Sequence, residues 1–229
     1  MGRILSTTLI TAGIVVLADA GLTVVWQEPV SAAYGALQQA RAEDQLAELE
    51  ERFPTAEDLA ALSGVSGDAA RARILAKRFK DELEPGRPIG RLEIERIGLD
   101  AVLMEGTDTA TLQRGPGHYR TTPLPGLGST VGIAGHRTTY LAPFRKIDEI
   151  KDGDEIRVEL PYAGFTYTVE KHEVVDPSDV HIIEPVGYER LVLTACHPLY
   201  SAAQRWAVFA KLTRVDTFAS SGGGVWPSP

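Results

Sequence analysis

One cysteine, one histidine and one arginine have residue types and positions that could do chemistry together. Cys196 is the single cysteine among 229 residues, so it cannot form a disulfide within the chain. A thiol acts as a nucleophile when it loses its proton, and its ordinary pKa of about 8.5 leaves it mostly protonated at neutral pH. The chain must therefore supply a histidine and a fixed hydrogen-bond donor beside the sulfur. A buried, structural cysteine is the alternative.

His136 has the most suitable setting of the five histidines for the role of base. It follows an apolar, strand-like run at residues 131–134 and precedes polar residues. It is therefore expected at the end of a strand, where functional residues gather on a β scaffold. A structural turn histidine is the alternative at this position.

The other histidines are weaker candidates. His197 adjoins Cys196, but neighbours on an extended chain point to opposite faces, so we expect it to shape the surroundings of the cysteine. His118, in a Gly-Pro-Gly-His-Tyr loop, is expected to shape the cleft, whereas His172 and His181 are interpreted as structural. No spacing of His, Cys and Asp fits a metal site, so neither a metal nor an organic cofactor is expected.

Arg205 opens the strand-like run that follows Cys196. A strand, a loop and a returning strand would bring its guanidinium back beside the thiol. The fixed fork of N–H donors suits a developing oxyanion or a peptide carbonyl. The alternative is an ordinary surface arginine, and the spacing does not decide between the two.

The composition excludes one class of partner and indicates an exported protein. The net charge is −8, and no cluster of Lys and Arg suits a nucleic acid. Residues 4–26 are mostly apolar behind Arg3 and long enough to span a bilayer. Asp19 opposes insertion by about 2.5–3.5 kcal/mol, and the apolar residues offset it. The positive-inside rule places the N-terminus in the cytoplasm. A signal peptide cleaved near residues 18–20 is the alternative.

The rest of the chain divides into a helical part and a β part. Residues 31–53 have apolar side chains at helical spacing and predict a solvated helix or stalk, and residues 68–83 predict an amphipathic helix. From residue 89 onward, short alternating runs separated by Gly, Pro and Asp predict many strands. Many strands with few helices between them favour a mostly β closed barrel or a sandwich.

Three motifs resemble the sortase family of cysteine transpeptidases. The run Leu-Thr-Ala-Cys-His-Pro at residues 193–198, followed by Gln-Arg-Trp-Ala-Val at 204–208, is similar to the sortase active-site signature. Upstream, residues 115–119 and 132–139 resemble the segment that delivers the catalytic histidine. The His-Arg-Thr-Thr-Tyr run and the Cys-His-Pro continuation are most similar to class E sortases of actinobacteria, with class D next. The resemblance covers residues 87–215.

The resemblance implies an eight-stranded β-barrel and a defined reaction. His136, Cys196 and Arg205 would be catalytic, and a thioacyl intermediate would form on the cysteine. The enzyme would cleave a sorting signal of the Leu-Pro/Ala-x-Thr-Gly type between Thr and Gly. It would then transfer the surface protein to an amine of a peptidoglycan precursor or a pilin. Further contacts with the substrate are expected from His118, Tyr140, Thr194, Ala195 and His197.

One departure from the family pattern bears on activity. Ala195 stands where sortases usually have Thr directly before the cysteine, and Val192 stands where the first Thr of the motif would be. If that hydroxyl assists the oxyanion, one donor is missing, and losing such a donor can reduce the rate by ~10²–10³-fold. A catalytically weak or inactive binding module with a sortase fold is therefore the alternative function.

Other cysteine enzymes fit less well. Papain-like hydrolases place the cysteine before the histidine, the reverse of the order here, and the Ser-x-Gly-Cys run of cysteine L,D-transpeptidases is absent. We therefore expect a membrane-bound enzyme with an extracellular catalytic domain. Its expected parts are a cytoplasmic start (1–3), a transmembrane anchor (4–26), a helical stalk or linker (27–86), the catalytic barrel (87–216) and a flexible tail (217–229).

Overall fold

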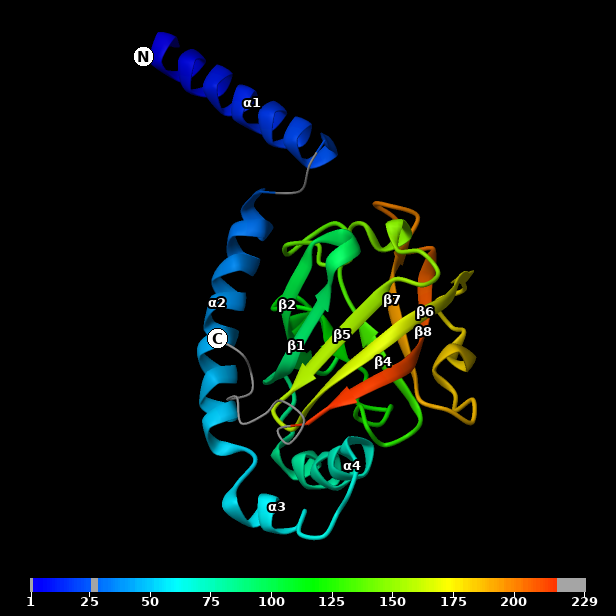
Figure 1. Ribbon diagram of the computed structural model, residues 1–229. Helices are drawn as coiled ribbons and strands as arrows, with labels where there is room; N and C mark the ends of the chain where they lie inside the picture. Colours follow the sequence, from blue (N-terminus) through cyan, green and yellow to red (C-terminus); the bar gives the residue numbers. More distant parts are fainter. Residues whose placement is uncertain (1, 26–28, 218–229) are drawn as a thin grey trace.

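A computed structural model describes residues 2–25 and 29–217 (Figure 1). The α-helices are α1 (Gly2–Val25), α2 (Pro29–Arg52), α3 (Ala56–Ala60), α4 (Asp68–Phe79) and α5 (Thr109–Leu112). Short 3₁₀ helices are η1 (Lys80–Glu82), η2 (Glu95–Ile97), η3 (Ile147–Glu149) and η4 (Val180–Ile183). The strands are β1 (Pro88–Ile94), β2 (Leu99–Glu105), β3 (Gly117–His118), β4 (Thr130–Ala134), β5 (Glu155–Leu160), β6 (Ala163–Val175), β7 (Arg190–His197) and β8 (Gln204–Asp216).

The strands close into a barrel in the order β1-β2-β3-β4-β7-β8-β6-β5. Two neighbouring pairs, β2 with β3 and β4 with β7, are parallel, and the remaining pairs are antiparallel. The prediction of a mostly β, closed eight-stranded barrel with short helices is confirmed. Closure leaves no unpaired sheet edge, so β4 and β7 lie in the interior of a continuous sheet.

Alternation along the strands separates two faces. On β7 and β8 the side chains of Leu191, Leu193, Ala195 and Val208 join the main core inside the barrel. Their neighbours Val192, Ala207 and Phe209 point outward and form a second apolar cluster with Val175 at the end of β6 and Ile182 in η4. Since side chains alternate with a period of two, the outer face that carries Val192 also carries the residues two and four positions later.

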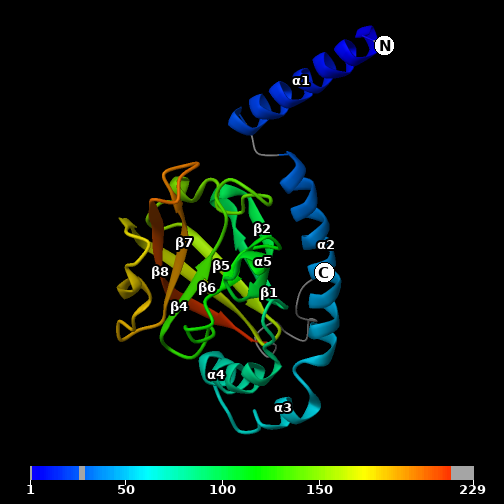
Figure 2. The same ribbon diagram turned by 180° about the vertical axis from the view of Figure 1, so that it is seen from behind.

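Helix α2 packs against the barrel, whereas the sequence predicted a solvated stalk. Ala42, Leu46, Leu49 and Phe53 recur at helical spacing and are all buried in the main core. Both views show α2 running beside β1 (Figures 1 and 2). The apolar stripe that we interpreted as belonging to an isolated helix is thus the face that docks on the domain.

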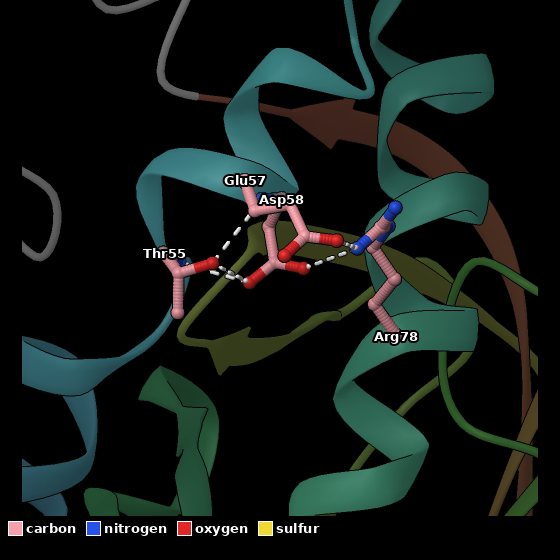
Figure 3. Close-up of polar contacts among 4 residues, drawn as sticks. All are labelled: Thr55, Glu57, Asp58 and Arg78. Carbon is pink, nitrogen blue, oxygen red and sulfur yellow. Dashed lines mark hydrogen bonds and ion pairs between the residues drawn. The ribbon is translucent and has the colours of Figure 1, made fainter.

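Helices α3 and α4 lie at one end of the barrel, and the loop that joins β7 to β8 lies at the other (Figures 1 and 2). We call these the helical end and the hairpin end. At the helical end, α3 begins with a capping box, in which the Thr55 hydroxyl accepts from the backbone N–H of Asp58 and the Asp58 carboxylate accepts from that of Thr55. Arg78 of α4 donates to Asp58 at 3.0 Å and joins the two helices (Figure 3).

Several predictions fall partly outside the described residues. Residue 1, residues 26–28 and the predicted tail from residue 218 are not described. Within the described ranges, none of the helices combines the length and the apolar character needed to cross a membrane.

Candidate active site

The hairpin of β7 and β8 brings Cys196 and Arg205 together. The two residues are paired in the antiparallel register, so their side chains leave the sheet on the same face. Cys196 is partly exposed. The Nη1 atom of Arg205 donates to the carbonyl oxygens of Ala202 at 3.0 Å and Gln204 at 2.9 Å. The loop therefore holds the guanidinium at the hairpin end, on the strand that pairs with Cys196.

The parallel pairing of β4 with β7 places His136 and Cys196 at the same end of two adjacent strands. Ala134 is paired with Thr194, and the N–H of Gly135 donates to the carbonyl of Thr194 at 3.1 Å. His136 and Cys196 each lie two residues beyond these partners, at the same end of adjacent strands. A Cβ on Gly135 would lie 2.6 Å from the ring of Phe144, so glycine allows the chain to pass this ring.

The His136 imidazole is half-buried and held by packing. Its Nε2 is buried and has no hydrogen-bond partner within the described part of the chain. The ring lies 5.3 Å from that of Tyr140, and the backbone N–H of Phe144 donates to the His136 carbonyl at 3.0 Å. Burial lowers the pKa of His136 below its usual value. The imidazole is thus mainly neutral at neutral pH and has a ring nitrogen available for proton transfer.

A partly exposed thiol, an imidazole and a guanidinium at one end of a barrel are the arrangement that a cysteine acyl transferase requires. Residues 92–213 match the family described as Sortase domain. This match covers more than half of the chain. The chain belongs to the sortase family.

Named relatives agree with this assignment. Sortase D of Bacillus subtilis is 35% identical over 153 residues, which cover 65% of this chain and 74% of the relative. Sortase SrtE1 of Streptomyces coelicolor is 31% identical over 152 residues, which cover 59% of this chain and 43% of the relative. The resemblance to classes D and E predicted from the motifs is confirmed, and the chain is an enzyme with sortase transpeptidase activity.

Solved sortase structures share the barrel. The transpeptidase Sortase D5 of Clostridium perfringens superposes with a TM-score of 0.60 at 27% identity, over 75% of this chain and 98% of that one. Sortase E1 of Streptomyces coelicolor, with a tripeptide in its active site, gives a TM-score of 0.58 at 28% identity, over 61% of this chain and 96% of that one.

The structure explains the departure of this sortase at position 195. Ala195 is 2% exposed and packs in the main core, so a hydroxyl at this position would point into the barrel, away from the face that carries Cys196. Thr194 is two residues before Cys196 and shares its outer face, and its hydroxyl pairs with that of Tyr119 at 2.8 Å. The alanine therefore removes no donor from the face of the sulfur. Any contact of Ala195 with a substrate would involve its backbone.

Arg137 is a residue of this sortase site that sequence reasoning missed. It is 4% exposed and donates to the carbonyl of Cys196 at 3.4 Å and to Nδ1 of His197 at 3.1 Å. An ion pair with Asp148 at 2.5 Å balances its charge. Arg137 therefore links the loop after His136 to the end of β7. Its position next to His136 was visible in the sequence, but most arginines are exposed.

His197 points to the side opposite Cys196, as alternation predicted. Its ring lies 5.3 Å from that of Trp206, which packs against the main core. With the bond from Arg137, these contacts fix the start of the hairpin loop. His197 thus contacts Arg137 and Trp206, which adjoin the end of β7 that carries Cys196.

His118 occupies a different setting from the one predicted. It is buried, with Nδ1 2.8 Å from a carboxylate oxygen of Glu105 and Nε2 3.1 Å from the hydroxyl of Thr122. Both His118 and Glu105 line a cavity of about 450 Å³ that is also lined by Leu83 and Leu124. The structure therefore gives His118 a buried carboxylate partner, and its predicted contact with substrate remains a prediction.

The two remaining histidines, His172 and His181, contact residues other than the three candidate catalytic ones. The ring of His172 stacks on Trp206 at 5.6 Å, and that of His181 lies 3.9 Å from an Asp179 oxygen. The described ranges contain no group of three His, Cys, Asp or Glu residues that could hold a metal ion.

Proposed function

We propose that Cys196 is the nucleophile of a transpeptidation that cleaves a Leu-Pro/Ala-x-Thr-Gly sorting signal between Thr and Gly. The observation that carries the proposal is the register of three adjacent strands. It sets Cys196 opposite Arg205 on β8 and at the same strand end as His136 after β4. The partial exposure of the sulfur supports access by a peptide.

The first half of the reaction forms a thioester. Neutral His136 accepts the proton of the Cys196 thiol, and the resulting thiolate attacks the threonine carbonyl carbon. The carbonyl oxygen becomes an oxyanion that accepts hydrogen bonds from Arg205 and a backbone N–H. The C–N bond to glycine then breaks, and protonated His136 gives its proton to the departing amine. The sorted protein remains attached to Cys196 through the sulfur.

The second half returns the enzyme to its starting state. An amine of a peptidoglycan precursor or a pilin attacks the thioester carbonyl, and neutral His136 takes the amine proton. The C–S bond breaks, a new amide bond joins the surface protein to its acceptor, and the released thiolate recovers the proton from His136. The lowered pKa of His136 supports a neutral imidazole that can act as this base.

The outer face of β4 and β7 is proposed to receive the sorting signal. Thr194 shares this face with Cys196 and is tied to Tyr119, which supports its predicted role in contacting the peptide. Tyr140, predicted to contact the second residue of the signal, lies against His136. The partners in this proposal are surface proteins with a C-terminal sorting signal.

Anchoring of the catalytic domain on the outer side of a membrane by residues 4–26 is part of the same proposal. Leu9, Ile14 and Leu17 on α1 are all more than 60% exposed, and contiguous exposed apolar side chains mark contacts with a membrane or a partner. Fractionation of cells that express the full chain tests this point. Recovery of the protein in the membrane fraction, with protease-accessible barrel epitopes, is expected. Recovery in the soluble fraction would contradict the anchor.

A peptide assay with and without an amine acceptor tests the enzymatic proposal. Fluorogenic peptides with Pro or Ala at the second signal position are incubated with the full chain, and the products are identified by mass. Formation of an amide with the acceptor amine is expected. Hydrolysis that the amine never diverts would contradict transfer. Absence of any cleavage would favour the inactive binding module, although the inward orientation of position 195 removes the main support for that alternative.

A further inference from the structure

The loop that follows His136 has an unusual backbone. Tyr140, Leu141 and Ala142 have positive φ angles of 51°, 65° and 43° in succession. Each left-handed residue with a Cβ costs about 1–2 kcal/mol. Such a conformation persists only where the surrounding structure imposes it. The contacts that impose it come from a helix far away in the sequence.

Helix α2 holds this loop with its first turns. The Ser31 hydroxyl accepts from the backbone N–H of Tyr140 at 3.1 Å, and the Tyr34 ring meets the Tyr140 ring edge-on at 6.1 Å. Gly35 allows the close approach, because a Cβ there would lie 3.0 Å from the Tyr140 carbonyl carbon and 3.2 Å from the Leu141 nitrogen.

The same part of α2 is fixed to the barrel. The Gln39 side-chain oxygen accepts from the N–H of Val102 at 2.8 Å, and its nitrogen donates to the carbonyl of Arg114 at 2.5 Å. Further along the helix, the side chains of Ala42 and Leu46 are buried. The first turns of α2 are therefore a rigid support, and the 140–142 loop rests on it.

Tyr140 connects this support to the imidazole. Its ring lies between Tyr34 of α2, at 6.1 Å, and His136, at 5.3 Å. Since Nε2 of His136 has no hydrogen-bond partner within the described residues, ring packing takes the part that a hydrogen bond often plays in orienting a catalytic histidine.

We propose that helix α2 is a positioning element of the active site, which holds Tyr140 against His136 through Ser31, Tyr34 and Gly35. Tyr140 is a positioning residue in this account, because it acts through the imidazole. The inference rests on the proposed function of His136 as the acid and base of the reaction. It gives helix α2, which precedes the barrel in the sequence, a role in positioning the active site.

Two consequences follow for His136. If the Tyr140 ring is withdrawn, the imidazole gains water and its pKa rises toward the usual value, because burial is what lowers it. Tyr140 contacts the imidazole from its own loop with Tyr34 behind it, and burial is the cause of the lowered pKa of His136. The freed ring also loses its orientation, and a misplacement of about 1 Å can cost up to 10²-fold in rate.

The test compares Gly35→Leu and Tyr140→Ala with the matched variants Ala33→Leu and Tyr140→Phe in the full chain. Ala33 is exposed on the same helix, and phenylalanine keeps the ring. NMR titration gives the His136 midpoint, and peptide assays give kcat and KM. We expect the first two variants to raise the midpoint and to lower kcat about tenfold, with KM within about twofold in Gly35→Leu, which keeps the Tyr140 ring. Ala33→Leu should behave like the wild type, and Tyr140→Phe, which keeps the ring, should keep the wild-type midpoint of His136.

An unchanged midpoint and kcat in Tyr140→Ala, with only a lower melting temperature, would overturn the proposal. If Gly35→Leu fails to fold, the Tyr140→Ala and Tyr140→Phe pair probes the same contact from the loop. The NMR midpoint needs no turnover. If the proposed transpeptidation is wrong, neither the wild type nor the variants will cleave the peptide, but the midpoint can still be measured. The midpoint therefore separates failure of this inference from failure of the proposed reaction.

Discussion

A buried polar side chain at the helical end of the barrel and one at the hairpin end differ in how many hydrogen-bond partners they have. At the helical end, the buried Glu189 carboxylate accepts from the N–H groups of Gly126 and Gly128 and from the hydroxyl of Tyr167, each at 2.8–2.9 Å. At the hairpin end, the His136 Nε2 is buried with no partner in the described ranges. The Glu189 carboxylate thus has three donors, whereas the His136 Nε2 has no partner among the described residues.

Backbone strain follows the same division. The three successive left-handed residues at 140–142 adjoin His136 at the hairpin end, whereas α3 at the helical end begins with a complete capping box. Strain and unsatisfied groups concentrate at functional sites and must be stabilised elsewhere in the fold. The comparison implies that substitutions at the hairpin end change activity with little change in stability, and that those at the helical end do the reverse.

Cys196→Ala should give the largest effect. Removing the nucleophile should lower peptide cleavage by at least ~10³-fold, while the melting temperature changes little because the thiol is partly exposed. Activity assays and thermal unfolding of the same preparation check both parts. Robust cleavage by this variant would refute the assignment of the nucleophile.

Arg205→Ala should reduce kcat by ~10²-fold, because the oxyanion loses a charged donor. The Nη1 atom also holds the carbonyls of Ala202 and Gln204, so thermal unfolding must accompany the kinetics. Arg214→Ala is the matched control, since it removes an arginine from the other end of β8. Equal activity in the two variants would remove Arg205 from the mechanism.

Glu189→Ala should reverse the pattern at the helical end. Three donors lose their acceptor, and a buried group left without a partner costs about 1–3 kcal/mol. Urea unfolding should show a loss of at least about 2 kcal/mol with near-normal kcat at low temperature. Glu184→Ala, an exposed neighbour, should cost less than about 0.5 kcal/mol. A comparable loss of kcat in Glu189→Ala alone would break the separation of the two ends.

Asp58→Ala should have the smallest effect, because it removes the cap of α3 and the bond from Arg78. Losing an N-terminal cap costs about 1 kcal/mol, measured by urea unfolding. Glu57→Gln is the control, because its ion pair with Arg78 is exposed and weak. If the two variants lose the same stability, the capping box is not what stabilises this end.

Much of the fold was predictable because the signals were local. Alternation along residues 155–160 and the buried, apolar run at 191–194 predicted strands, which the structure contains as β5 and as part of β7. The types and order of His136, Cys196 and Arg205 identified a candidate site because a lone thiol has specific chemical requirements. Strand register then placed the three residues at one end of the barrel.

Contacts between distant segments were not predictable from these signals. The stripe of Leu46, Leu49 and Phe53 is the same for a solvated amphipathic helix and for one docked on a barrel, so the pattern does not reveal the partner. The burial of Arg137 depends on Asp148 and His197 arriving from other loops. The inward orientation of Ala195 follows from the alternation of side chains along β7. Predicting which residues face inward required knowing the boundaries and register of that strand.

Trapping the acyl-enzyme tests the central claim most directly. The full chain is mixed with a sorting peptide, quenched in acid, digested and analysed by mass spectrometry. The account predicts that the peptide portion ending in threonine is attached to the fragment that contains Cys196, and that added amine discharges it. Cleavage of the peptide with no adduct on Cys196, undiminished in Cys196→Ala, would contradict it.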